Sequence, residues 1–432
     1  MAKSTGSVID DLINDEFTQM IDLSKEDDSV SYWIDSGNWA INYISSKHFS
    51  GAYPQGQIIG FAGKSGVGKS MLPDIATKDP NLDKIIILDS EGGGNGKKLL
   101  EFLGAPLEKV RYKMIQTLDS YKIVTNSKGE QEIKEIKDSE IPAKLKGDNY
   151  EVHVGLIAFL KKLLYALEYN HSQEKILIIV DSLSNLKSVR KLNGGEDMGR
   201  TNKLLNDLFA LDNVIKNTNA TLAFAAKIYT DLNNQYNTDG IINGGEAVIY
   251  NPSLILQMSA LQDNPELSDA ELSEEKARRK TSLGNSLKTV RVKVKKSRFG
   301  TEGRNAWVVL DATYGLVRNS GLFQLLFDFK VIKKQGTKYS IPGIFVNEKG
   351  EDILFYKKDF LEIFGKDEKG YIDKFQAAMD EAEERIKAAK MNININDTDE
   401  LPNEEDEDIS TFDMLNAMEA EAESEVTVDE SN

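Results

Sequence analysis

Residues 58–70 read IIGFAGKSGVGKS, and this stretch decides the fold. From Gly63 it follows the pattern G-x-x-x-x-G-K-S, which is typical of a phosphate-binding loop between a buried strand and a helix. Glycines here let successive backbone N–H groups turn toward phosphate oxygens. A chance glycine turn is the weaker interpretation, because a buried-strand pattern precedes the loop. We expect the loop to bind a nucleotide through Gly63, Lys64, Ser65, Gly66, Val67, Gly68, Lys69 and Ser70.

Four side chains are expected to form the catalytic part of this site. In such a loop the lysine, here Lys69, bridges the β- and γ-phosphates, and the Ser70 hydroxyl is a ligand of Mg²⁺. Asp181 ends a buried run and is expected to hold Mg²⁺ through water; a helix-capping carboxylate is the alternative. Glu91 follows another buried run and can polarise a water; an exposed loop acid is the alternative. The expected cofactors are ATP and Mg²⁺.

The composition limits the class of protein. The chain has 432 residues, no cysteine and three histidines, which excludes disulfides, thiol catalysis and Cys-based zinc sites. No apolar run approaches the roughly 18 residues of a membrane helix, and the first residues lack the apolar segment of a signal peptide. We therefore expect a cytoplasmic chain with no membrane partner.

The formal net charge of −17 is concentrated at one end of the chain. Residues 396–432 contain 15 Asp or Glu and no Lys or Arg, and without these acids the charge would be −2. Such a segment cannot form a packed core, so we expect a disordered acidic tail over 393–432. Apolar residues over 409–418 form either a short docking helix or incidental content. The net charge therefore does not decide what the body of the chain binds.

Continuous apolar runs alternate with helical patterns. Runs at 57–62, 84–89, 175–182 and 221–226 are separated by segments with helical spacing, which predicts an α/β fold with a mainly parallel central sheet flanked by helices. Ligands bind at the carboxyl ends of such strands. The predicted core is a phosphate-loop ATPase domain, because the loop and both acids fall at these ends.

The predicted organisation has four parts. Residues 1–30 carry an amphipathic helix (7–24) that docks either on its own domain or on a neighbouring subunit. The ATPase core spans 31–319, with polar inserts near 122–150 and 262–287; the first is predicted as a hairpin or mobile loop. A small α+β domain follows over 320–392, before the tail.

Cations gather in the second half of the core. Residues 276–304 contain 11 Lys or Arg and one acid, and within them Lys296 and Arg298 end a strand where valines alternate with cations. A solvated face is one interpretation; contact with a phosphate on a neighbouring subunit is the other. Two polar loops with flanking cations suit single-stranded nucleic acid. The candidate DNA-binding residues are Arg190, Lys191, Arg200, Tyr229, Tyr236, Gly244 and Gly245.

The order of these motifs resembles that of the RecA-type strand-exchange recombinases, and among them the UvsX recombinases of T-even-like bacteriophages. The resemblance covers most of residues 31–340. It rests on five segments in this order: Gly63–Ser70, Asp89-Ser90-Glu91, Ile179-Val180-Asp181-Ser182-Leu183, Asn243-Gly244-Gly245-Glu246-Ala247 and Lys296-Ser297-Arg298. The phosphate loop, taken by itself, is found in many ATPases, so the order of all five carries the resemblance. The acidic tail is a further similarity.

The resemblance implies that the core is RecA-like, and that the chain is a DNA-dependent ATPase that forms helical filaments on single-stranded DNA and pairs it with homologous double-stranded DNA in recombination, repair and replication. It implies that Glu91 activates water, and that Lys296 and Arg298 reach the γ-phosphate across the subunit interface. Loops 188–200 and 228–245 correspond to the two DNA-binding loops. The implied partners are DNA, further copies of the chain, a mediator and a single-strand-binding protein. The implied location is the host cytoplasm if a phage encodes the chain.

Two positions depart from the family pattern. Lys227 stands where the family has a Gln or His that senses the γ-phosphate; lysine can contact phosphate but has no acceptor, so only nucleotide binding is expected of it. Lys97-Lys98-Leu99 stands where the family often has an aromatic residue that stacks on adenine, and that contact is not carried over.

Two other functions are compatible with the same core. A RecA-like hexameric DNA helicase is expected to carry a sizeable N-terminal domain, whereas residues 1–30 precede the core here. A regulatory RecA-like ATPase that acts as an interaction scaffold is disfavoured by the basic stretch and the two polar loops.

Overall fold

The computed structural model describes residues 30–92, 96–147, 149–195, 198–229, 240–261, 287–311, 315–367 and 369–396. The predictions for the helix over 7–24, for Tyr236, for most of the insert near 262–287 and for the tail beyond residue 396 lie outside the described residues. Within them, no helix combines the length and apolar content needed to cross a bilayer.

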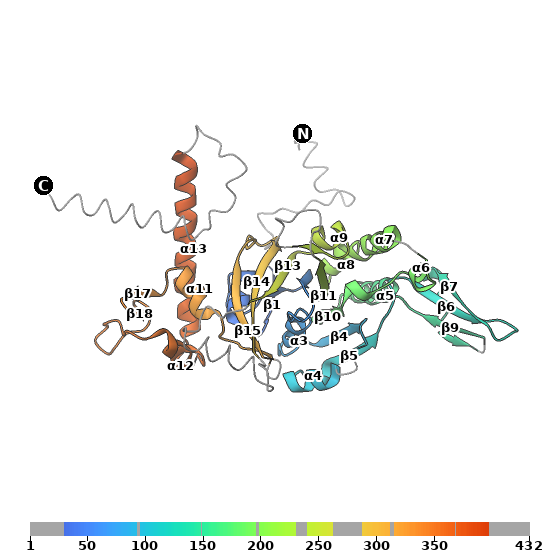
Figure 1. The fold of residues 1–432 in the computed structure, drawn as a ribbon, viewed down its shortest axis with the longest axis horizontal. Coiled ribbons are helices and arrows are strands. Elements are labelled where there is room, and N and C mark those ends of the chain that lie inside the picture. Colours follow the sequence, from blue (N-terminus) through green and yellow to red (C-terminus); the bar gives the residue numbers. More distant parts are fainter. Residues whose placement is uncertain are drawn as a thin grey trace, which may run out of the picture.

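A ten-stranded mixed sheet forms the centre of the molecule (Figure 1). The strands from β13 to β5 run parallel to one another, while β14, β15 and β16 extend one edge in antiparallel fashion. The strand order is β16 (Gly315–Leu316), β15 (Asn305–Asp311), β14 (Leu287–Ser297), β13 (Leu254–Ala260), β3 (Ile58–Gly63), β11 (Ala220–Tyr229), β10 (Ile176–Asp181), β4 (Lys84–Asp89) and β5 (Val110–Met114), with β12 (Ile241–Ile242) paired to β11. The predicted α/β class with a mainly parallel sheet is confirmed.

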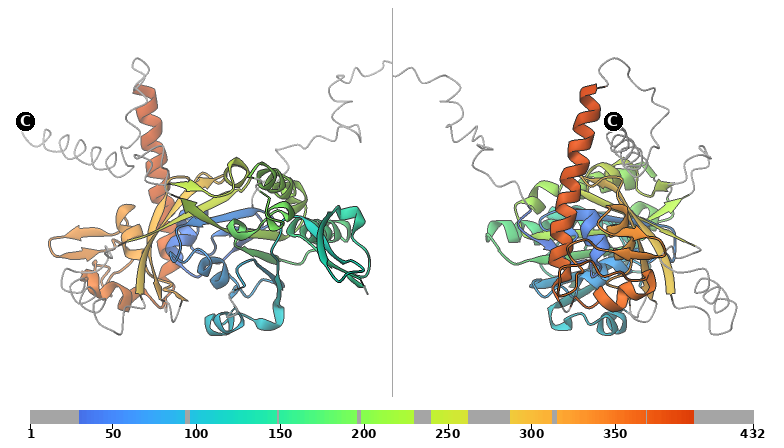
Figure 2. Two further views of the ribbon diagram at one scale, coloured as in Figure 1. Left: turned by 45° about the vertical axis from the view of Figure 1, so that its right-hand side comes forward. Right: turned by 90° about the vertical axis from the view of Figure 1, so that its left-hand side faces the viewer.

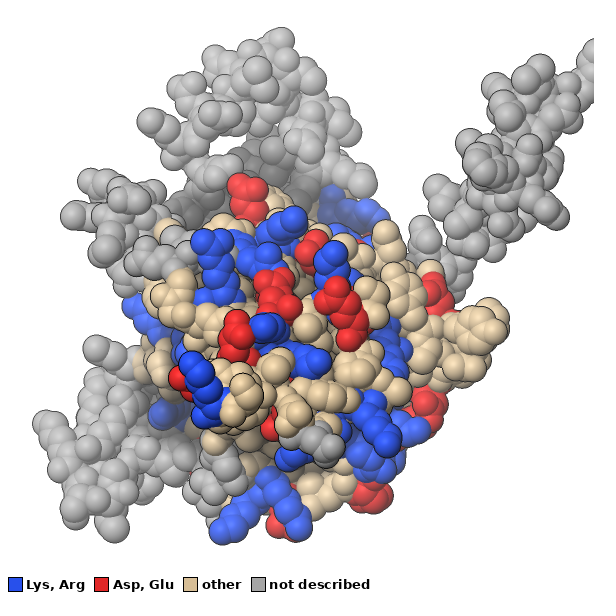
Figure 3. Space-filling model, turned by 90° about the vertical axis from the view of Figure 1, so that its right-hand side faces the viewer, with Lys and Arg blue, Asp and Glu red and all other residues tan. Residues whose placement is uncertain are grey.

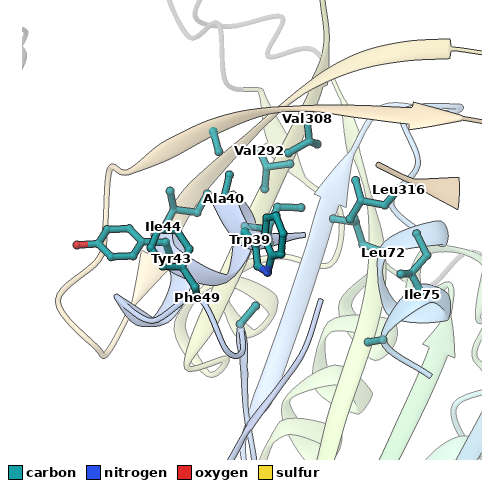
Figure 4. Packing of buried hydrophobic residues seen from close by; sticks show 14 of the residues in the cluster. Trp39, Ala40, Tyr43, Ile44, Phe49, Leu72, Ile75, Val292, Val308 and Leu316 are labelled. Carbon is teal, nitrogen blue, oxygen red and sulfur yellow. The ribbon is translucent and has the colours of Figure 1, made fainter. Parts of the chain in front are cut away.

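Alternate residues of the central strands enter two cores, because successive side chains of a strand point to opposite faces. Ile59 and Phe61 of β3 pack with helices α2 (Trp39–Ser46), α3 (Met71–Ala76) and α4 (Gly96–Leu103), as Figure 4 shows in part. Ile58 and Ala62 of the same strand pack on the other face. That face is covered by α5 (Leu156–Tyr169), α7 (Met198–Phe209), α8 (Asp212–Lys216) and α9 (Glu246–Tyr250).

The first insert is an ordered antiparallel sheet at one end of the molecule, which corrects the mobile-loop alternative (Figure 1). Its strands, in the order β7-β6-β9-β8, are β7 (Gln131–Ile136), β6 (Ser120–Thr125), β9 (Tyr150–His153) and β8 (Lys146–Gly147). Helix α5 follows this sheet and begins at Leu156. Residues 150–153 pair with β6, where the His153 ring stacks on Tyr121 at 4.5 Å.

The C-terminal part packs on the α2 face of the sheet. It contains α11 (Leu322–Asp328), the predicted hairpin β17 (Lys333–Gln335) and β18 (Lys338–Ser340), α12 (Phe360–Phe364) and the long α13 (Tyr371–Asn396) (Figure 2). Aromatic rings dominate its interior, and these residues join α2 in one continuous apolar cluster. The ion pair between Arg304 and Glu383, at 2.5 Å, also ties α13 to the core. The predicted boundary near residue 320 stays a prediction.

Candidate functional site

The Gly63–Ser70 loop connects the carboxyl end of β3 to α3, as the sequence predicts. Gly66 and Gly68 have φ values of 77° and 96°, which side-chain-bearing residues rarely adopt. A Cβ on Gly68 would also lie 2.3 Å from Leu310 Cδ1, so any other residue there would require the Leu310 side chain to move. Lys69 is only 7% exposed. The lysine of the loop is therefore sheltered from solvent. α3 is brief, and Pro73 lies within it.

Ser70 and Asp181 meet below this loop. The Ser70 hydroxyl donates to Asp181 Oδ1 at 2.8 Å, because β10 ends level with the loop two strands away. Burial raises the pKa of Asp181, with Glu91 and Asp89 adding to the rise, while the Ser70 hydrogen bond and Lys69 oppose it. A hydroxyl and a carboxylate fit Mg²⁺, which takes oxygen ligands and uses few from the protein. Among the described residues, no cluster of three or more potential ligands forms a metal site of protein groups alone.

Asp74 is a residue that sequence reasoning missed. It lies in the first turn of α3, four residues after Ser70. Burial raises its pKa to about 7, and the negative charges of Asp181 and Asp89 contribute. The only sequence signal was an acid in the helix that follows the loop. The negative charges of Asp181 and Asp89 thus act on Asp74, and a cation bound near Asp181 would reduce that repulsion.

Glu91 lies at the carboxyl end of β4, on a turn fixed by Asp89. Asp89 Oδ1 accepts from the backbone N–H groups of Glu91 at 2.7 Å and Gly92 at 3.0 Å. Tyr112 of β5 donates to the other oxygen of Asp89 at 2.5 Å, which raises the pKa of Tyr112 to about 12. The turn is therefore held from both sides. Glu91 lies close enough to Asp181 to raise the pKa of that carboxyl.

An open depression of about 480 Å³ lies beside Glu91. It is lined by side chains at the ends of three neighbouring strands and by the start of the predicted first DNA loop: Ser90, Glu91, Ser184, Asn185, Leu186, Lys187, Lys191 and Lys227. No residue of the Gly63–Ser70 loop lines it. The depression therefore adjoins the predicted nucleotide site on the side of the predicted DNA loops.

Lys296 and Arg298 do not lie at the chain's own loop. β14 is antiparallel to β13, so Arg298 is level with Ile58, at the amino end of β3. The loop follows Gly63, roughly 17 Å further along the strand. Lys296 Nζ instead donates to the carbonyls of Ile249, at 3.1 Å, and Tyr250, and burial lowers its pKa, as does the charge of Arg298.

Arg298 has similar contacts near the end of α9. Its guanidinium donates to the Asn251 carbonyl at 3.2 Å and lies 3.6 Å from Asp212. The basic residue that does reach the loop within the chain is Lys288, at the other end of β14. Its Nζ donates to the Gly66 carbonyl at 3.2 Å. Sequence reasoning missed Lys288, because the strand order needed to place it was unknown.

Some of the predicted DNA-binding residues are exposed, and others already contact residues of the same chain. Arg190 and Lys191, on α6 (Val189–Leu192), are exposed, and so is Tyr229. Arg200 pairs within the chain with Asp119, at 3.4 Å, and with Glu135 of the insert sheet. Both Gly244 and Gly245 have positive φ and lead from β12 into α9. Figure 3, which faces the insert end, shows cations interspersed with acids.

Four parts of the chain lie together at the carboxyl ends of the parallel strands: the loop, Asp181, the Glu91 turn and Lys227. Neither a scan of protein-family models nor a search among curated proteins finds a match for the chain. The interpretation of the site therefore rests on geometry and residue chemistry.

Proposed function

We propose that the chain is an ATPase that assembles as a helical filament on single-stranded DNA and pairs it with homologous double-stranded DNA. The observation that carries the nucleotide part is the 2.8 Å hydrogen bond from Ser70 to Asp181 beneath a glycine loop that shelters Lys69. That arrangement matches the needs of phosphoryl transfer, in which the protein positions a triphosphate and stabilises its charge. The recombinase part rests on the motif order and on the two candidate DNA loops.

In this proposal the residues of the site have separate roles. The loop N–H groups and Lys69 bind the phosphates, Ser70 and Asp181 hold Mg²⁺, and Glu91 accepts a proton from the attacking water. Mg²⁺, when bound, offsets the negative charge of the phosphates. The nearby carboxylates repel one another without a cation, so binding the metal relieves a cost that is present in the free chain.

Lys296 and Arg298 act on a neighbouring subunit in this proposal. Their distance from the chain's own loop excludes a role in that loop's phosphate contacts, which leaves a phosphate of another copy or a structural role at the end of α9. Cations supplied from a neighbour stabilise the transferring phosphoryl group in other nucleotide hydrolases. ATP bound between subunits would then join them, and filament assembly would complete the site.

Single-stranded DNA would lie along the loops at 188–200 and 228–245. Arg190 and Lys191 are exposed for phosphate contacts, and Tyr229, 53% exposed, is available for base stacking. Arg200 would have to leave Glu135 and Asp119 to contact DNA. A mediator and a single-strand-binding protein are the proposed protein partners.

Electron microscopy of the chain with single-stranded DNA and a non-hydrolysable ATP analogue tests the assembly. We expect helical filaments that require both ligands. Closed rings would contradict the proposal and favour the helicase alternative. Discrete particles under all conditions would also contradict it, and would favour a regulatory scaffold. Omitting the nucleotide is the matched control, since the proposed site between subunits is incomplete without it.

A further inference from the structure

One carboxylate oxygen of Glu91 is engaged by three side chains. Glu91 Oε1 accepts from Asn185 Nδ2 at 2.6 Å and from the Ser182 hydroxyl at 3.2 Å. Lys227 Nζ lies 3.8 Å from the same oxygen. A carboxylate oxygen has two lone pairs, and the two hydrogen bonds occupy both of them. The three contacts therefore fix the orientation of the Glu91 carboxylate, while its second oxygen, Oε2, keeps lone pairs that can accept a proton.

Lys227 is itself fixed at a junction of the sheet. Its Nζ donates to Asn185 Oδ1 at 2.8 Å, so Asn185 connects Lys227 to Glu91. The Lys227 N–H donates to Ser184 Oγ at 2.8 Å, and its carbonyl accepts from the Asn243 N–H at 2.8 Å. In the sheet, Lys227 is level with Gly63, where the phosphate loop begins.

We infer that Asn185 and Lys227 are positioning residues that hold Glu91 in a resting orientation and so restrain ATP hydrolysis in the free chain. The inference rests on the proposed function, because it assigns a regulator to the same Glu91. Asn185 belongs to none of the motifs by which the sequence indicates the site, and of Lys227 the sequence predicts nucleotide binding only. Asn185 follows β10 in the short helical turn 183–185, and Lys227 comes from β11, so the strand order brings them together.

The contacts of Lys227 also indicate what would release Glu91. Directly after Lys227, Ile228 and Tyr229 pair with Ile242 and Ile241 of β12. This strand pair forms the base of the second candidate DNA loop. DNA bound along that loop would shift the strand pair and, with it, the backbone that holds the Lys227 side chain. Withdrawal of Lys227 would leave Asn185 without its second partner and allow the Glu91 carboxylate to turn away from its resting orientation.

The test compares the rate of ATP hydrolysis without DNA in the wild type and in four variants. Lys227→Met and Asn185→Ala are expected to raise kcat about two- to fivefold, the range expected for losing a partly exposed charge or hydrogen-bond contact. KM for ATP is expected to stay unchanged in Asn185→Ala, because Asn185 has no assigned contact with the nucleotide. The double variant is expected to match the larger single effect, because both residues act through one contact. Lys227→Arg keeps the charge and is expected to raise kcat less than Lys227→Met does. Lys187→Met changes a lysine in the same depression that no described interaction joins to Glu91.

Two results would overturn the inference. One is a kcat, measured without DNA, that falls or stays unchanged in Lys227→Met and Asn185→Ala. The other is an equal rise of this kcat in the control variant Lys187→Met. Thermal unfolding and nucleotide affinity, measured on every variant, separate misfolding from release of Glu91. The wild type separates this inference from the proposed function: absence of ATP hydrolysis would refute the proposed function itself. Hydrolysis that DNA stimulates, with no rise in the variants, would refute only the role of Asn185 and Lys227.

Discussion

Replacing Lys69 with alanine is expected to lower the rate of ATP hydrolysis by about a hundredfold or more. Removal of one preorganised donor from the charge that develops in a transition state costs that much in other enzymes. Lys69 is 7% exposed in a glycine loop, so neither water nor another lysine can take its place without rearrangement. The measurement is phosphate release at saturating ATP, together with nucleotide affinity.

Lys84→Ala is the matched control for Lys69→Ala. Lys84 is an exposed lysine at the amino end of β4, at the opposite edge of the sheet, where it pairs with Glu174. Its loss should change the rate by less than about twofold, since an exposed ion pair contributes little. A Lys69→Ala chain that is folded and keeps more than about a tenth of the wild-type rate would contradict the assignment of the loop.

Asp74→Asn is expected to stabilise the chain at alkaline pH and to leave it nearly unchanged at acid pH. The pKa of Asp74 is about 7 in the folded chain, against about 3.9 when unfolded. The folded state therefore retains a proton between pH 4 and 7 that the unfolded state releases. Stability from this group is present below pH 4 and is lost as the pH rises through 7. Asparagine mimics the protonated form, so the variant avoids that loss.

The size of the effect follows from the pKa difference. Three pKa units correspond to at most about 4 kcal/mol at pH 9, at 1.36 kcal/mol per unit. Urea unfolding at pH 4 and pH 9, without nucleotide or Mg²⁺, measures it. Asp373→Asn is the control, because Asp373 is an exposed acid in the first turn of α13, where an acid contributes less than about 1 kcal/mol. An increase in the free energy of unfolding of Asp74→Asn that is equal at both pH values would contradict the raised pKa of Asp74.

The sequence predicted the strands with continuous apolar runs, and the structure places them as expected. β3, β4 and β10 are of this kind, because both of their faces are buried. β5 was missed, since this edge strand is largely exposed and reads Val-Arg-Tyr-Lys-Met. The helical segment between β10 and β11 is divided into α7 and α8 near Leu211, which the helical spacing alone does not show. The short strand β9 could not be predicted from a local pattern, because its partner β6 lies about thirty residues earlier in the chain.

Within the candidate site, residues that belong to local motifs were predictable and residues that meet across strands were not. The spacing in the loop and the acid that ends β10 were sufficient to anticipate the meeting of Ser70 and Asp181. The contacts of Glu91 with Asn185 and Lys227 depend on β10 lying between β4 and β11, which no local pattern encodes. For the same reason the valine alternation predicted the buried face of β14 but not that Lys288, at its start, reaches the loop.

The rate of ATP hydrolysis with and without single-stranded DNA tests most directly the central claim that one chain joins a nucleotide site to DNA binding. The depression beside Glu91 opens toward Lys191 of the first candidate DNA loop, and Lys227 connects Glu91 to the second. We expect DNA to raise the rate severalfold, and added salt to reduce that stimulation because phosphate contacts are salt-sensitive. Hydrolysis at a rate that single-stranded DNA does not change would contradict the account while leaving the nucleotide site in place.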